Sequence, residues 1–332
     1  MKQDKRLSVV VPFYNEVDQV PITCEVLSKI LDGLEMDYEL ILIDDGSKDG
    51  TWQALSNCAR TKPRIRLLRF SRNFGKEAAI TAGMDAVTGH AVILLDGDLQ
   101  HPPDLIPEMV RLWLEEGYDL VDGIKADRGT ESALSRFAAN TFYGIFEQSG
   151  GMNLKDASDF KLLNRRALEA YKLMREQGTF FRGMSAWLGF RRINLPFEVQ
   201  DRETGTSKWR FTNLVRLSLN AVTSFSAKPL EWVALLGIIF LFLATLLGLQ
   251  TLIRWIIGHA VAGFTTVILL QLLIGGLVIT SLGLIGLYIA RIYDEVKGRP
   301  RYLLQAEVRP RGEDDDPGLR DLKEELELGD TP

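Results

Sequence analysis

The sequence of 332 residues contains only two cysteines, Cys24 and Cys58, and three histidines. The cysteines form no CxxC pair and no zinc-ligand spacing, which argues against a disulfide framework and against a structural zinc site. Two thiols in a chain of this length are typical of a reducing compartment. The cytoplasm is therefore the expected location of the region that contains them.

Other signals are missing as well. The apolar run Leu7–Val11 is too short for the core of a signal peptide and ends at Pro12. No GxGxxG turn follows it, so a dinucleotide-binding Rossmann domain loses its main support. The formal net charge of −5 comes from residues 306–332, which hold ten acidic and four basic residues. The rest of the chain has no basic excess that would indicate nucleic-acid binding.

The first half of the chain alternates short β-branched runs with segments of helical periodicity. Such alternation predicts an α/β fold, with a mostly parallel sheet covered by helices on both faces. The expected strands are Leu7–Val11, Glu39–Ile43, Ile65–Phe70, Ala91–Leu95 and Leu120–Ile124, and the expected helices are Val17–Leu31, Thr51–Arg60, Lys76–Val87 and Leu105–Glu116. Further along, the pattern predicts helices over Glu131–Glu147 and Arg165–Arg175, strands over Asp159–Leu163 and Arg192–Val199, and a polar loop over 201–208.

Two long uncharged runs follow. Trp232–Ile253 and Phe264–Ala290 contain no charged residue, and about 20 such residues suffice to cross a bilayer as a helix. They predict a C-terminal two-helix transmembrane hairpin. Basic residues lie before the first run and after the second, whereas the connecting loop holds only Arg254 and His259. The positive-inside rule therefore places both chain ends in the cytoplasm.

These patterns divide the chain into four regions. Residues 1–208 form a cytoplasmic catalytic domain, and 209–228 an amphipathic helix that lies in the membrane interface or, alternatively, faces a core. Residues 229–292 form the hairpin. Residues 293–332 form a cytoplasmic C-terminal segment whose part after Gln305 is expected to be a disordered acidic tail or a short surface helix.

Polar residues stand where the strands end, and ligands of parallel sheets bind at the carboxyl ends of the strands. Asp44 and Asp45 end the second strand and could accept hydrogen bonds from a nucleobase and a ribose, while Asp49 suits a helix cap. After the fourth strand, Asp96, Asp98 and Gln100 project to one side if the backbone is extended. Their oxygens are ligands that Mg²⁺ or Mn²⁺ prefers. Gly97 would allow a close approach to the backbone.

Taken together, these motifs resemble the family-2 glycosyltransferases with the GT-A fold. The sequence is similar in particular to the polyisoprenyl-phosphate glycosyltransferases, the group of dolichol-phosphate mannose synthases and bacterial undecaprenyl-phosphate glucosyltransferases. The resemblance covers roughly residues 7–300. It rests on Val11–Glu16 (VPFYNE), Asp44–Ser47 (DDGS), Ser71–Lys76 (SRNFGK), Asp96–Pro102 (DGDLQHP) and Asp156–Leu163 (DASDFKLL).

The resemblance implies a role for each matching position. The nucleotide-sugar pocket would be lined by Pro12, Tyr14, Glu16, Asp44, Asp45, Lys76 and Asp96. The metal on the diphosphate would be held by Asp96, Asp98 and Gln100. The acceptor phosphate would be approached by Arg128, Arg136 and Asn140, with Arg202 and Lys208 near the phosphates. Asp159 would act as a base or orient the acceptor, and Asp98 and Asp159 are the residues expected to be catalytic.

The resemblance also implies an inverting, metal-dependent enzyme of the plasma membrane. Its donor would be a UDP-sugar, most simply UDP-glucose, and its acceptor polyprenyl (undecaprenyl) phosphate. A GDP-mannose-using mannosyltransferase and a processive polysaccharide synthase remain alternatives. The second of these has little support, because Gln250–Trp255 has one residue too many for a QxxRW motif.

Small residues in the second uncharged run predict a homo-oligomer, with a tetramer favoured. Gly276 and Thr280 form a small-xxx-small step, and Gly283 continues the same broad face. Such residues allow close helix packing in lipid. The alternative is that they pack only the two helices of one hairpin.

Overall fold

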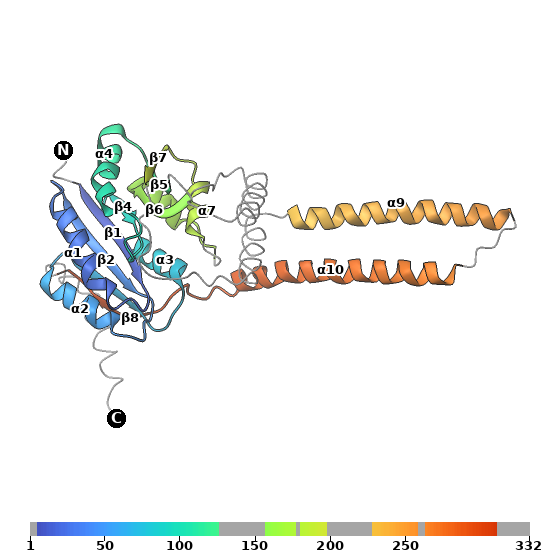
Figure 1. Ribbon diagram of the computed structural model, residues 1–332, viewed down its shortest axis with the longest axis horizontal. Coiled ribbons are helices and arrows are strands. Elements are labelled where there is room, and N and C mark those ends of the chain that lie inside the picture. Colours follow the sequence, from blue (N-terminus) through green and yellow to red (C-terminus); the bar gives the residue numbers. More distant parts are fainter. Residues whose placement is uncertain (1–4, 126–156, 177–179, 198–227, 258–262, 311–332) are drawn as a thin grey trace, which may run out of the picture. The chain divides into compact units, whose positions relative to one another are not determined.

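The computed structural model describes residues 5–125, 157–176, 180–197, 228–257 and 263–310. Its chain divides into two units. The catalytic unit contains the sheet and its helices, and the second unit contains the two long C-terminal helices (Figure 1). Each unit is described separately below.

The catalytic unit is built on an eight-stranded sheet in the order β7-β5-β6-β4-β1-β2-β3-β8. Strands β1, β2, β3 and β4 are parallel to one another, and β5 is parallel to β7. Strand β6 is antiparallel to β4 and β5, and β8 is antiparallel to β3. The mostly parallel sheet of a GT-A-like fold is confirmed. The strands are β1 (Arg6–Phe13), β2 (Asp37–Asp44), β3 (Ile65–Phe70), β4 (Ala91–Leu94), β5 (Leu120–Lys125), β6 (Ala157–Asn164), β7 (Arg192–Phe197) and β8 (Leu304–Val308).

Helices cover both faces of this sheet because successive side chains of each strand point to opposite sides. Val9 and Val11 of β1 belong to one apolar core, and Val10 between them belongs to the other. The first core packs against α1 (Gln19–Asp32), α2 (Thr51–Thr61) and α4 (Ile106–Glu116), and the second against α3 (Lys76–Ala86), α6 (Arg165–Lys172) and α7 (Phe181–Trp187). A short 3₁₀ turn, η1 (Pro103–Leu105), precedes α4.

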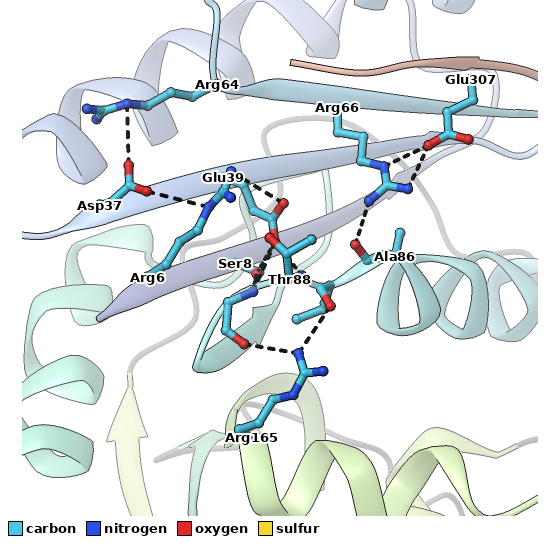
Figure 2. A network of polar contacts seen from close by, with 12 residues as sticks. Arg6, Ser8, Asp37, Glu39, Arg64, Arg66, Ala86, Thr88, Arg165 and Glu307 are labelled. Carbon is cyan, nitrogen blue, oxygen red and sulfur yellow. Dashed lines mark hydrogen bonds and ion pairs between the residues drawn. The ribbon is translucent and has the colours of Figure 1, made fainter. Parts of the chain in front are cut away.

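A buried carboxylate lies in the first half of β2, away from the carboxyl ends of the parallel strands. Glu39 is fully buried and accepts hydrogen bonds from the hydroxyl of Ser8 and from both the backbone N–H (2.7 Å) and the hydroxyl (2.9 Å) of Thr88 (Figure 2). The guanidinium of Arg6 lies 3.7 Å from its other oxygen. These partners offset the cost of burying the charge and hold the turn that leads into β4.

The structure differs from expectation at three places. Helix α7 and strand β8 lie in segments for which no such element was predicted, and β8 includes residues after Gln305. Residues 306–308 are therefore part of a strand, whereas residues 311–332 of the expected acidic tail lie outside the described residues. Helix α6 ends at Lys172, earlier than predicted. The predicted helix 131–147 and the predicted polar loop 201–208 lie outside the described residues, as does the predicted amphipathic helix 209–228 except for Lys228, which begins α9.

The second unit contains α9 (Lys228–Ile256) and α10 (Phe264–Val296), which include both predicted spans. Val233–Arg254 and Leu270–Lys297 are long and apolar enough to cross a membrane, and neither window is buried inside the structure. A Cβ added at Gly275, Gly276, Gly283 or Gly286 would meet no atom within 4 Å. In the structure these four glycines therefore make no close contact with the described side chains of α9.

Candidate active site

The candidate site lies where three neighbouring strands end. In the sheet β4 lies beside β1, and β1 beside β2, so the residues that follow them meet at one edge. Backbone bonds link these ends, from Asp45 N to Phe13 O (2.9 Å) and from Leu95 N to Val10 O (3.1 Å). The order of strands reverses between β1 and β4, which is where open α/β sheets bind ligands.

Asp44 and Tyr14 form one side of this edge. Asp44 is fully buried, and its Oδ1 accepts a 2.9 Å bond from Ser47 N while Oδ2 lies 3.4 Å from Nε of Arg69. The Arg69 guanidinium is in turn 5.3 Å from the ring centre of Trp52. Tyr14 is 43% exposed, which leaves its ring open for stacking on a planar ligand, while Pro12 is only partly exposed.

Asp45, the residue after Asp44, binds a loop of the protein. Oδ1 of Asp45 accepts a 2.7 Å bond from Phe74 N, and Oδ2 accepts bonds from Gly75 N (3.0 Å) and Asn73 Nδ2 (2.9 Å). Burial raises the pKa of Asp45, and the backbone donors of Phe74 and Gly75 oppose that rise. Both carboxylate oxygens of Asp45 therefore bind the loop before α3. The sequence had predicted that Asp45 contacts the nucleotide directly. The N-cap of α2 is Gly50, so the expectation that Asp49 is the cap is wrong. Oδ1 of Asp49 instead accepts a 2.9 Å bond from the N–H of Thr51, the first residue of the helix.

The Asp96–Gln100 segment is a turn, so the expected extended backbone is wrong. Leu99 has a φ of 54°, in the left-handed region, and Asp98 Oδ1 accepts a 3.1 Å bond from Gln100 N. Gly97 is needed for close contact within the chain, since an added Cβ would lie 2.5 Å from the ring of Phe13. The sequence predicted a close approach to the backbone at Gly97, but it did not indicate that the approaching group is the Phe13 side chain.

Glu16 lies close to both aspartates of this turn. Burial raises its pKa to about 7, with further contributions from the charges of Asp98 and Asp96. Its Oε2 is buried and accepts no hydrogen bond in the structure. The carboxylates of Glu16, Asp96 and Asp98, together with the unsatisfied oxygen of Glu16, suit a bound cation. Such a cation would stabilise the ionised form of each carboxylate. Among the described residues, no three His, Cys, Asp or Glu side chains lie close enough together to coordinate a metal ion in the geometry of this structure.

Lys76, the first residue of α3, bridges two carboxylates. Its Nζ is 2.6 Å from Oδ1 of Asp96 and 2.7 Å from Oδ2 of Asp159. Burial would lower the pKa of Lys76, but the charges of Asp159 and Asp96 outweigh it and raise that pKa. The ammonium therefore stays charged at neutral pH and joins the Asp96 turn to β6.

Asp159 is fixed from the other side by Arg182 of α7, a residue that the sequence analysis missed. The guanidinium donates from Nε (2.7 Å) and Nη2 (3.0 Å) to the two oxygens of Asp159. Burial alone would raise the pKa of Asp159, but hydrogen bonds from Arg182 and the charges of Arg182 and Lys76 hold it well below its usual range. A carboxylate that binds protons so weakly is a poor general base. Of the two roles expected for Asp159, general base or orienting residue, the geometry favours the orienting role.

Two other residues of the site were not singled out from the sequence. Glu77, next to Lys76, accepts a 2.9 Å bond from Phe181 N at the start of α7, and burial raises its pKa to about 7. His101 is buried against Phe160 and Phe197, with its Nδ1 3.8 Å from Oδ2 of Asp96. The motif Asp96–Pro102 contained His101, but nothing in the sequence indicated which side chain it would face.

The predicted acceptor residues cannot be placed in this geometry. Arg128, Arg136, Asn140, Arg202 and Lys208 all lie outside the described residues. The described site is thus the half formed by the strand ends, the Asp96 turn and the Lys76–Asp159–Arg182 cluster.

Several known proteins are similar to this chain. The family model "Glycosyl transferase family 2" matches residues 8–193. An uncharacterized glycosyltransferase, YkcC, of Bacillus subtilis is 35% identical and covers 92% of this chain and 95% of its own. A bactoprenol glucosyl transferase of Shigella phage SfX is 34% identical, and the match covers 91% of this chain and 99% of that protein. A mannosyltransferase structure from Pyrobaculum calidifontis has 18% identity and a TM-score of 0.44, and the match covers 84% of this chain and 87% of that chain.

Proposed function

This chain is a member of glycosyl transferase family 2, and from that premise we propose that it transfers a sugar from a nucleotide-sugar to polyprenyl phosphate. The observation that carries the proposal is the 34% identity, over 91% of the chain, to a protein named bactoprenol glucosyl transferase. UDP-glucose is accordingly the proposed donor and undecaprenyl phosphate the proposed acceptor.

The proposed reaction is a single displacement at the anomeric carbon. An oxygen of the acceptor phosphate forms the new bond to C1 of the sugar, the bond from C1 to the diphosphate breaks, and UDP leaves with inversion. A phosphate monoester with a second pKa near 6 is already largely anionic at pH 7. A general base is then not needed, in keeping with the paired state of Asp159, and positioning with electrostatics supplies the rate.

A divalent metal, Mg²⁺ or Mn²⁺, is part of this proposal. Asp96, Asp98 and Gln100 would hold it, beside the unsatisfied oxygen of Glu16. When bound, such an ion neutralises charge on the leaving diphosphate. The ammonium of Lys76 lies at the same place, 2.6 Å from Asp96, and would add a second positive charge toward the phosphates.

We also propose that α9 and α10 anchor the protein in the plasma membrane, with the catalytic unit and both termini in the cytoplasm. The two long apolar windows support the anchor, and the basic residues on either side of the hairpin support the orientation. A lipid-linked acceptor would then reach the enzyme by diffusion in the bilayer. Assembly into a homo-oligomer through the glycines of α10 is part of the same proposal.

The test uses the purified full chain in lipid vesicles that contain undecaprenyl phosphate. Radiolabelled UDP-glucose, UDP-galactose, UDP-N-acetylglucosamine and GDP-mannose are supplied one at a time, with Mg²⁺, with Mn²⁺ or with EDTA. Label from UDP-glucose should pass into the organic phase, and it should not do so with EDTA. Label entering a water-soluble polymer would support a processive synthase instead, and label from GDP-mannose alone would support the mannosyltransferase alternative.

A further inference from the structure

The segment that follows α10 returns to the catalytic unit and ends in its sheet. We call residues 301–308 the strap. Its strand β8 pairs antiparallel with β3, with Leu67 opposite Val308 and Phe70 opposite Leu304. The strap is thus continuous in sequence with the second long apolar helix, while its own contacts are with the sheet that carries the site.

One group of strap contacts reaches the loop before α3. Leu303 O accepts a 3.0 Å bond from Ser71 N. The ring of Tyr302 stacks on Phe70 with centres 5.2 Å apart, and Phe70 meets the edge of Phe74 at 5.7 Å. The backbone N–H of Phe74 is one of the donors that bind Asp45. A continuous series of contacts therefore runs from the strap to the residues just before Lys76.

A second group of contacts reaches the opposite end of α3. The hydroxyl of Tyr302 donates a 3.0 Å bond to Asp85 Oδ2. Arg66 donates to Glu307 Oε1 from Nε (2.9 Å) and Nη2 (2.6 Å), and from Nη1 to Ala86 O (2.7 Å), as Figure 2 shows. Asp85 and Ala86 are the last two residues of α3. Arg301 extends the same attachment to the segment just after α6, by donating from Nη2 to Met174 O (3.0 Å).

Helix α3 is itself held close to the sheet, because an added Cβ at Gly83 would lie 2.3 Å from Val10. That contact fixes its distance from the strands. The strap contacts act at its two ends and restrict movement along and around its axis. Lys76, at the first position of α3, must reach Asp96 at 2.6 Å and Asp159 at 2.7 Å at once, so a small shift of the helix would break one of these ion pairs.

We propose that the strap positions α3 for catalysis, and that Tyr302 is its principal positioning residue. The hydroxyl of Tyr302 bonds Asp85 at the end of α3, and its ring stacks on Phe70, which in turn contacts Phe74 in the loop before α3. The proposal rests on the proposed function, since Lys76 is taken to face the leaving diphosphate. Misplacement of a catalytic group by about 1 Å can cost on the order of a hundredfold in rate.

The test combines kinetics with hydrogen–deuterium exchange on the full chain in detergent. Tyr302→Ala should raise deuterium uptake in peptides that cover 71–87 and lower kcat on the order of tenfold, with KM for UDP-glucose changed less than about twofold. Tyr302→Phe keeps the ring stack and loses the bond to Asp85, so both effects should be smaller. Val308→Thr changes an exposed side chain of β8, keeps the backbone pairing with β3 and touches none of the side-chain contacts above, so it should resemble wild type.

Glu307→Gln serves as a second, milder variant in case Tyr302→Ala fails to fold, and it should raise uptake in the last turn of α3. Unchanged uptake over 71–87 in folded Tyr302 and Glu307 variants would overturn the proposal. So would a kcat that falls only in proportion to the loss of folded protein. If wild type transfers no sugar to lipid phosphate, the proposed function fails, while the exchange measurement still decides whether the strap holds α3.

Discussion

The ammonium of Lys76 and the carboxylate of Asp159 lie 2.7 Å apart, and the same ammonium reaches Asp96 at 2.6 Å. One positive charge therefore connects the turn that would bind metal to strand β6. This arrangement makes Lys76 the residue that links the Asp96 turn to Asp159.

Replacing Lys76 with Met should lower kcat for transfer by about a hundredfold or more, because a charged donor aimed at the leaving group is lost. Lys76→Arg should recover part of the activity. Lys29→Met, an exposed lysine on α1, is the matched control. A kcat for Lys76→Met within about threefold of wild type would contradict a direct role.

Asp98→Asn should abolish metal binding and lower transfer on the order of a hundredfold or more, since such an ion supplies several kcal/mol of charge stabilisation. Binding of Mn²⁺ followed by electron paramagnetic resonance gives a measure independent of turnover. Asp104→Asn, at an exposed position in η1, should bind Mn²⁺ normally. Unchanged Mn²⁺ affinity in Asp98→Asn would remove this residue from the metal site.

The pairing of Arg182 with Asp159 predicts strong coupling between the two positions. Arg182→Gln leaves a buried carboxylate with one partner fewer, and Asp159→Asn replaces two charged acceptor oxygens with one neutral acceptor, so each change alone should lower kcat/KM. The double variant should be no worse than the poorer single variant. Arg60→Gln, at an exposed site on α2, is the control. Strictly additive losses would show that the two residues act separately.

Glu77 predicts a pH dependence of stability. Its pKa is raised from 4.5 to about 7 in the folded state by burial, so the folded state binds more protons than the unfolded state between these values. The stabilisation is present below pH 4.5 and is lost as the pH rises through about 7. The Tm of wild type minus that of Glu77→Gln, measured in detergent, should fall from pH 5 to pH 8. A difference independent of pH would contradict the raised pKa.

Gly276→Leu combined with Gly283→Leu should reduce the mass of the detergent-solubilised particle, since large side chains would prevent close approach of α10 helices from different chains. Static light scattering with correction for bound detergent measures that mass. Gly248→Leu, in α9, is the control and should leave it unchanged. A wild-type protein that is monomeric and active in several mild detergents would refute the oligomer.

Much of the catalytic unit could be predicted from sequence because its strands are apolar runs bounded by turns, and its ligand residues follow strand ends. The pattern located Asp44, Asp96 and Asp98 at one edge of the sheet. It could not reveal that Asp45 binds the loop before α3, because that depends on how a segment 30 residues away folds back. Arg182 was missed for the same reason, since a single arginine in a short helix resembles any surface arginine.

Strand β8 was missed for a further reason. Leu304–Val308 is short and lies directly before a segment rich in acidic residues, so composition outweighed the local pattern. Its strand character depends on pairing with β3, which lies more than 230 residues earlier in the chain. Pairing over such a separation leaves no local signal.

The position of β8 has a consequence for how the protein is made. While the ribosome is still synthesising the long apolar helices, β3 is an edge strand with unpaired backbone groups, which is a template for aggregation. The last strand becomes available only after both helices have left the ribosome, so the sheet is completed after the hairpin has been synthesised. A soluble fragment that ends before residue 228 would keep that edge open permanently. Expression of the catalytic unit alone should therefore yield aggregated protein unless residues 301–310 are supplied in the same chain through a short linker.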